Sequence, residues 1–108
     1  MNRKYAILFS FIFFLISSCK WPEYVGTYYS TNCNMLEKVE IHPDETVDLR
    51  YYGMNFSVNR PARINQNIIT VLNRETQAIE YEFEYKNGAL YETSGMDLNC
   101  VLKKDTLR

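Results

Sequence analysis

The chain is poor in the residues and patterns from which most enzyme active sites are built. It has a single histidine among 108 residues, so a general base would have to be His42 or a carboxylate. Neither a glycine-rich phosphate-binding loop nor a nucleophile elbow occurs. No basic patch stands out, which argues against nucleic acid as a partner. We therefore expect a protein that is not an enzyme and that has no catalytic residues and no cofactor.

Two groups of polar side chains are candidates for a metal-binding or catalytic site. His42 stands close to Asp44 and Glu45 and would make half of a metal site, but nothing else offers nitrogen or sulfur ligands. We interpret it as a turn histidine on a solvated face and expect no metal. Glutamates alternate along residues 80–84, which is typical of the wet face of a strand.

Long apolar sequence occurs mainly at the start of the chain. Arg3 and Lys4 precede an almost purely apolar run, Tyr5 to Ile16, and Ser17, Ser18 and Cys19 follow. A basic start, an apolar core of about a dozen residues and small residues before a cut site are typical of a secretory signal. The run is too short for a spanning helix, which needs roughly 20 apolar residues. The sequence predicts a cleaved signal peptide over residues 1–18.

The end of this signal, Ile16-Ser17-Ser18-Cys19, resembles the bacterial lipobox. The resemblance implies that the Cys19 thiol receives a diacylglyceryl group and becomes the first residue of an exported, membrane-anchored lipoprotein. Lys20 is not the aspartate that commonly retains such proteins in the inner membrane. In a host with two membranes, this implies delivery to the periplasmic face of the outer membrane. The alternative is an ordinary signal peptide with an incidental cysteine.

The mature chain is small and slightly acidic. Removal of 18 residues from 108 leaves 90, and loss of Arg3 and Lys4 leaves ten basic against thirteen acidic side chains, a net charge of −3. A domain of this size needs a stabilising cross-link in addition to its core, and an exported protein can use a disulfide. A Cys33–Cys100 bond would close a loop worth about 4 kcal/mol in the chain-entropy model. Two free thiols are the alternative.

Helical periodicity is absent from the mature chain, and strand signals dominate it. The clearest strand is predicted over Ala78 to Tyr85, with Ile79, Tyr81 and Phe83 facing the core. Asn87-Gly88 after it is a strong hairpin signal, because both central residues of such a turn need positive φ. We expect about eight short strands in an all-β fold, a small antiparallel meander barrel or a sandwich.

Two stretches fit this pattern less simply. Asn59 to Gln66 is the least regular, since Arg60-Pro61 argues against a central strand. Met96 to Lys103 is predicted as the closing strand, with Met96 and Leu98 on the same side as Cys100. The predicted organisation is a lipidated tether over residues 19–23, a β-barrel domain over 24–104 and a tail over 105–108.

Much of the mature chain resembles the membrane-bound inhibitors of c-type lysozyme, which are small bacterial lipoproteins. The pieces that carry the resemblance are Cys33, Val39-Glu40-Ile41, Val47 to Tyr52, Tyr81 to Gly88 and Leu98 to Leu102. It implies an eight-stranded barrel, a bond between an early cysteine and one in the last strand, and a role for Lys86 in facing the acidic catalytic residues of lysozyme. The family's Ser-Gly-x-x-Tyr loop has no counterpart between residues 59 and 77.

The expected function is therefore that of a monomeric, lipid-anchored envelope protein that binds lysozyme or another protein. One alternative is a small-ligand carrier, because the opening Val25 to Tyr29 resembles lipocalin-like lipoproteins. Tyr28, Tyr51 and Tyr81 would then line the mouth of a cavity. A second alternative is an envelope or immunity lipoprotein whose partner the sequence does not indicate.

Overall fold

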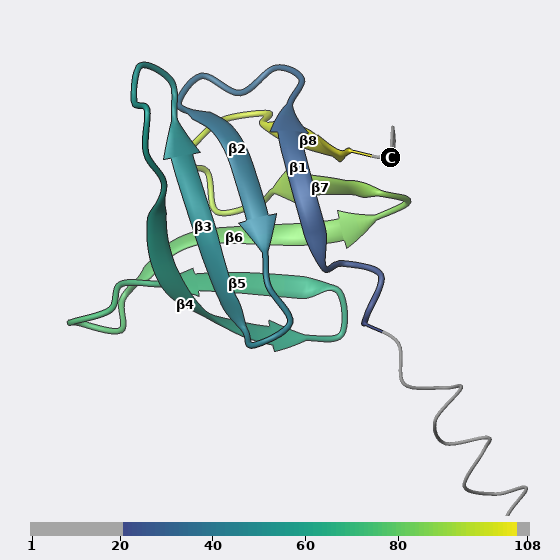
Figure 1. Ribbon diagram of the computed structural model, residues 1–108, viewed down its shortest axis with the longest axis vertical. Coiled ribbons are helices and arrows are strands. Elements are labelled where there is room, and N and C mark those ends of the chain that lie inside the picture. Colours follow the sequence, from purple (N-terminus) through teal and green to yellow (C-terminus); the bar gives the residue numbers. More distant parts are fainter. Residues whose placement is uncertain (1–20, 106–108) are drawn as a thin grey trace, which may run out of the picture.

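The computed structural model describes residues 21–105. The predicted signal peptide, Cys19 and residues 106–108 lie outside these described residues. Eight strands, each antiparallel to its neighbours and in sequence order, close into a barrel (Figure 1). The strands are β1 Gly26–Ser30, β2 Leu36–Ile41, β3 Thr46–Tyr51, β4 Val58–Asn65, β5 Ile68–Leu72, β6 Ile79–Lys86, β7 Ala89–Glu92 and β8 Val101–Lys104. The all-β prediction is confirmed, and the barrel is the form that it takes.

Alternation along the strands places one apolar face of the sheet inside the barrel. Tyr81 and Phe83 are buried there, as predicted. Ile79 was predicted to join them and does not, since its side chain is 59% exposed. The pairing of β5 with β6 shifts at this point, from Val71 opposite Tyr81 to Leu72 opposite Ile79. This irregularity breaks the period of two, and Ile79 is therefore turned outward.

The stretch around Arg60-Pro61, predicted to be the least regular, lies inside β4. Residues 58–61 pair with β3, whereas residues 62–65 pair with β5. The Ala62 N–H donates to the Glu45 carbonyl on the β3 side at 2.9 Å. The nitrogen of Pro61 therefore points to the β5 side, where pairing begins only at Ala62. The proline occupies a position at which no N–H is needed, which explains why a strand accepts it.

The prediction of a closing strand over Met96 to Lys103 was too long. Only β8, Val101–Lys104, is a strand, and Met96 and Leu98 are exposed. Asp97, which lies between them, is 2% exposed. The loop is folded around buried carboxylate hydrogen bonds rather than around its apolar side chains, so the alternating pattern misled the prediction.

The barrel closes where β1 pairs with β8. The predicted Cys33–Cys100 disulfide is present and joins the β1–β2 connection to the residue just before β8. Thr31 N–H also donates to the Val101 carbonyl at 2.9 Å. The bond therefore reinforces the seam between the first and last strands.

Because consecutive strands are antiparallel, their connections alternate between two ends of the barrel. We call one the N-terminal end; it holds residues 21–25 and the turns at 42–45, 66–67 and 87–88. The other, the far end, holds the connections at 31–35, 52–57, 73–78 and 93–100. In Figure 1 the N-terminal segment and the β6–β7 hairpin lie at the right, and the β3–β4 and β5–β6 connections project at the left.

Candidate functional site

The interior of the barrel is filled by its own side chains. No pocket is found among residues 21–105. Tyr28 and Tyr81, predicted to line a cavity mouth, are buried in the core. The Tyr28 hydroxyl donates to the Tyr24 carbonyl at 2.6 Å, and its ring meets the Tyr85 ring edge to face. Burial raises the pKa of both buried tyrosines well above the usual range, so they remain neutral phenols.

Lys86 lies at the N-terminal end of the barrel. It is exposed and precedes the two-residue turn Asn87-Gly88, whose φ values of 52° and 77° confirm the predicted hairpin geometry. The Gly88 carbonyl accepts from the Lys104 N–H at 2.9 Å, and the Lys104 ammonium donates to the Glu23 carbonyl. The backbone of Lys86 is fixed by its pairing with Ala89 in this hairpin, and the hairpin lies beside the segment that leads to Cys19.

The far end of the barrel is rich in exposed apolar side chains. Six large apolar residues there have exposures between 40% and 69%: Met35, Tyr52, Phe56, Ile79, Met96 and Leu98. The connections at this end contribute few charges, and the exposed ones are Arg74 and Glu75. Aromatic residues and methionine with few charges are typical of the centre of a protein–protein interface.

Asp97 positions two of the far-end connections. Its carboxylate accepts hydrogen bonds from the backbone N–H groups of Asn34, Met35 and Leu36 at 2.9, 2.9 and 3.1 Å. Burial acts to raise the pKa of Asp97, but these three donors outweigh it and the pKa is lowered. The ionised side chain therefore fixes the β1–β2 connection against the β7–β8 connection.

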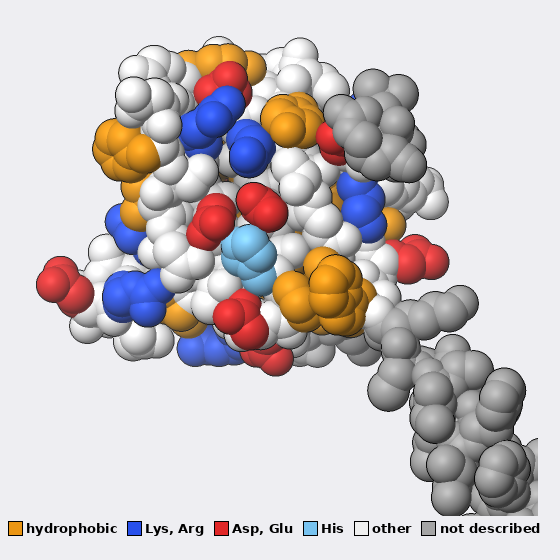
Figure 2. All heavy atoms as spheres, viewed as in Figure 1, with side chains coloured by type: hydrophobic (Ala, Val, Ile, Leu, Met, Phe, Trp, Pro, Cys, Tyr) orange, Lys and Arg blue, Asp and Glu red, His pale blue; other side chains and the backbone are white. Residues whose placement is uncertain are grey.

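A second polar group lies on the outer surface of β2 and β3. His42 Nε2 lies 3.0 Å from Asp48 Oδ2. Glu40 is directly opposite Asp48 in the pairing of the two strands. One ligand atom from each of Glu40, His42 and Asp48 lies within 4.8 Å of the other two. Figure 2 shows the histidine in the middle of this face with acidic side chains around it.

The prediction for His42 was therefore incomplete. The residue follows β2 at the predicted turn, and its N–H donates to the Thr46 carbonyl at 3.0 Å. The side chain is half-buried and paired rather than free on a solvated face. Burial acts to raise the pKa of Asp48, but hydrogen bonds from Asn59 and His42, with the charges of His42 and Lys38, outweigh it and lower the pKa.

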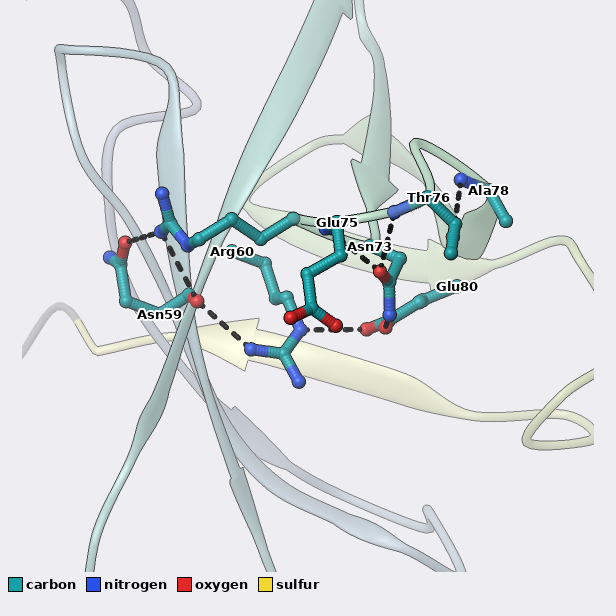
Figure 3. Close-up of polar contacts among 8 residues, drawn as sticks. Asn59, Arg60, Asn73, Glu75, Thr76, Ala78 and Glu80 are labelled. Carbon is teal, nitrogen blue, oxygen red and sulfur yellow. Dashed lines mark hydrogen bonds and ion pairs between the residues drawn. The ribbon is translucent and has the colours of Figure 1, made fainter.

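Hydrogen bonds extend from Asp48 across β4 to the β5–β6 connection. Asn59 Nδ2 donates to Asp48 Oδ1 at 2.6 Å, and Arg74 Nη2 donates to Asn59 Oδ1 at 2.5 Å. Beside them, Arg60 on β4 forms an ion pair with Glu80 on β6 at 3.1 Å (Figure 3). Glu80, one of the alternating glutamates at residues 80–84, therefore links β6 to β4. The hydrogen bond from Asn59 fixes the orientation of the Asp48 carboxylate.

No family model, curated protein or solved structure matches this chain. Within residues 21–105 there is also no helix that is long and apolar enough to cross a membrane. The lipoprotein and lysozyme-inhibitor resemblances therefore remain expectations from the sequence.

Two features of these sites were not predicted from the sequence: the pairing of Glu40 with Asp48 and the burial of Asp97. The pairing of Glu40 with Asp48 follows from the turn at residues 42–45 and the register that it sets, Ile41 opposite Val47. That signal was available, because the turn was predicted. The buried Asp97 had no comparable signal, since its N–H donors lie more than sixty residues earlier in the chain.

Proposed function

We propose that this protein is a non-enzymatic, lipid-anchored lipoprotein of the bacterial envelope that binds another protein through the far end of its barrel. Cys19 provides the anchor, at the periplasmic face of the outer membrane in a host with two membranes. The barrel is monomeric. The partner is a protein rather than a nucleic acid.

The observation that carries the proposal is the position of the exposed apolar side chains. Six of the nine exposed large apolar side chains in the described residues lie at the far end, opposite the segment that leads to Cys19, and the other three are Trp21 on that segment, Tyr29 on β1 and Tyr91 on β7. On an anchored barrel they face away from the lipid surface. Scattered exposed apolar residues are ordinary, but a concentration at one end of a small domain is typical of an interaction site. The filled interior does not support the alternative of a small-ligand carrier.

Lysozyme or another wall-cutting enzyme is the partner class indicated by the resemblance. In this form of the proposal, Lys86 is held rigidly by the hairpin and its charge meets a carboxylate pair of the enzyme. Lys86 and the far-end apolar residues occupy opposite ends of the barrel, so one compact interface does not include both. The two surfaces can therefore be tested separately.

The test is a site-specific photocrosslinking experiment on the full-length protein in its own membrane. A crosslinker replaces Phe56 at the far end, Lys86 at the N-terminal end, or Tyr91, which is exposed on the outer face of β7. A far-end interface predicts one discrete protein adduct from position 56 and none from position 91, whereas an adduct from position 86 and not from position 56 would assign the interface to Lys86. Adducts of equal yield from positions 56 and 91 contradict a far-end interface.

A lysozyme inhibition assay tests the partner class. If Lys86 contacts the enzyme, the Lys86→Ala variant binds about 1 kcal/mol or more weakly, roughly fivefold. Arg63→Ala is a matched control, because Arg63 is also an exposed cation but lies on β4, away from the β6–β7 hairpin. Stoichiometric inhibition that is lost in Phe56→Ser and kept in Lys86→Ala assigns lysozyme to the far end. Absence of inhibition would exclude lysozyme as the partner. The crosslinking result would then decide whether the far end binds another protein.

A further inference from the structure

We propose that Glu40, His42 and Asp48 bind a divalent transition-metal ion of the zinc class on the outer surface of β2 and β3. This site is independent of the far-end surface. It consists of one imidazole and two carboxylates, which are groups that bind Zn²⁺ in proteins.

The first argument is the pairing of like charges. Glu40 and Asp48 are directly opposite each other on adjacent strands, an arrangement that is destabilising unless something compensates it. Asp48 has His42 and Asn59 as partners. Among the described residues, no hydrogen bond or ion pair is found for the half-buried Glu40 carboxylate. The charge of Lys38 acts on Asp48 but forms no ion pair with Glu40 among the described residues, so a bound cation would supply the positive charge that contacts Glu40 directly.

The second argument is geometry. Zn–N and Zn–O bonds of about 2.0–2.1 Å place neighbouring ligand atoms of a tetrahedral site roughly 3.3 Å apart. His42 Nε2 and Asp48 Oδ2 are 3.0 Å apart, so this pair opens by only a few tenths of an ångström. The oxygen of Glu40 lies within 4.8 Å of both atoms. A rotation of its long side chain is enough to bring it to the ion. Three protein ligands leave the fourth position to water.

The third argument is the support behind the ligands. Asn59 donates to the Asp48 oxygen that does not face His42, and Arg74 donates to Asn59. Such outer hydrogen bonds orient metal ligands and are worth about 10–100-fold in affinity. The imidazole also sets the ion class, because carboxylates with water suit Mg²⁺ and Ca²⁺, whereas imidazole favours Zn²⁺, Ni²⁺ and Cu²⁺.

The test uses the full-length protein in mild detergent after treatment with a chelator. Titration calorimetry with ZnCl₂ should give one saturable site, and Zn²⁺ should raise the melting temperature. MgCl₂ and CaCl₂ at the same concentration should do neither. Co²⁺ should give the visible absorption of a four- or five-coordinate ion with nitrogen and oxygen ligands.

Two variants remove ligands, and one serves as a control. His42→Gln and Glu40→Gln should each weaken Zn²⁺ binding about tenfold or more. Glu84→Gln, a half-buried carboxylate on β6 across the barrel, should bind as the parent does. Without metal, Glu40→Gln should melt roughly 1–5 °C higher than the parent, because it removes the like-charge pair.

The combination separates a metal site from a simple ion pair. A simple His42–Asp48 pair predicts no saturable Zn²⁺ binding. Absence of binding, equal binding of Ca²⁺ and Zn²⁺, or parent-like Zn²⁺ affinity in Glu40→Gln would each overturn the proposal. Unfolding of a variant would show in its circular dichroism spectrum, and the remaining ligand variant then carries the test.

Discussion

Asp97 shows how much one side chain can decide in a small barrel. It is the one buried charged residue in the described part of the chain, and it lies beside the disulfide at the far end. Three backbone N–H groups surround its carboxylate. Such a nest of donors binds an anion, and here the anion belongs to the protein itself. The far-end connections therefore depend on a polar contact rather than on apolar packing alone.

Replacement of Asp97 should be strongly destabilising. In Asp97→Asn the amide NH₂ faces at least one of the three N–H donors, so a buried donor loses its acceptor. We expect a loss of about 2–3 kcal/mol in the free energy of unfolding, measured by urea denaturation. Glu84→Gln is a suitable control, because it makes the same chemical change on the outer surface. Equal effects from both variants would contradict the role assigned to Asp97.

The stability of the barrel should also depend on Asp97 at acid pH. The folded pKa is below the unfolded value of about 3.9, so the stabilisation is fully present above that pH. It is lost as the pH falls through the lower folded pKa. Denaturation between pH 7 and pH 2 should show a decrease in stability below about pH 4 that is smaller in Asp97→Asn. Parallel curves for the two proteins would exclude this linkage.

Phe83 and Ile79 form a matched comparison on one strand. Phe83 is fully buried and Ile79 is 59% exposed, although both belong to the same alternating pattern. Phe83→Ala should reduce the free energy of unfolding by about 3–5 kcal/mol. Ile79→Ala should change it by about 0.5 kcal/mol or less. Thermal denaturation of both variants therefore tests whether the irregular pairing of β5 with β6 turns the Ile79 side chain out of the core.

At the scale of elements, the seam between β1 and β8 is the vulnerable part of the barrel. These are the first and last of the eight strands in sequence order, and they pair over only three positions. Closure of a sheet by its first and last strands requires a long loop to be ordered. The Cys33–Cys100 bond reduces that requirement by holding the two strands together in the unfolded chain as well.

Loss of the disulfide should therefore destabilise the whole barrel. The double variant Cys33→Ala/Cys100→Ala should lose about 2–5 kcal/mol, seen as a lower urea midpoint. Reduction of the parent protein by dithiothreitol should have a similar effect, whereas the double variant should not respond to it. A reduced parent that is as stable as the oxidised one would contradict this account.

For the whole molecule, the orientation of the two ends matters most. The segment that leads to Cys19 enters β1 at the N-terminal end, and the exposed apolar residues lie at the other. An anchor at Cys19 would place Lys86 toward the lipid headgroups and the far end toward other proteins. In the proposed function, the topology of the barrel would thus link localisation to recognition.

The anchor itself can be tested by localisation. We expect mass spectrometry of the mature protein to show a lipidated Cys19 as first residue. Cys19→Ala should prevent lipidation and processing at this site, so that no acylated mature protein is formed. A parent protein recovered without lipid in the water-soluble fraction would contradict the lipobox interpretation.

Local signals predicted most of the strands, the β6–β7 hairpin and the all-β class, because a period of two and the φ preference of Asn87-Gly88 do not depend on distant residues. It also indicated the Cys33–Cys100 pair, because only two cysteines follow the predicted anchor. The burial of Asp97 and the exposure of Ile79 were settled instead by contacts between distant parts of the chain. These depend on which residues of other strands lie opposite, and register between strands is set by closure of the entire barrel.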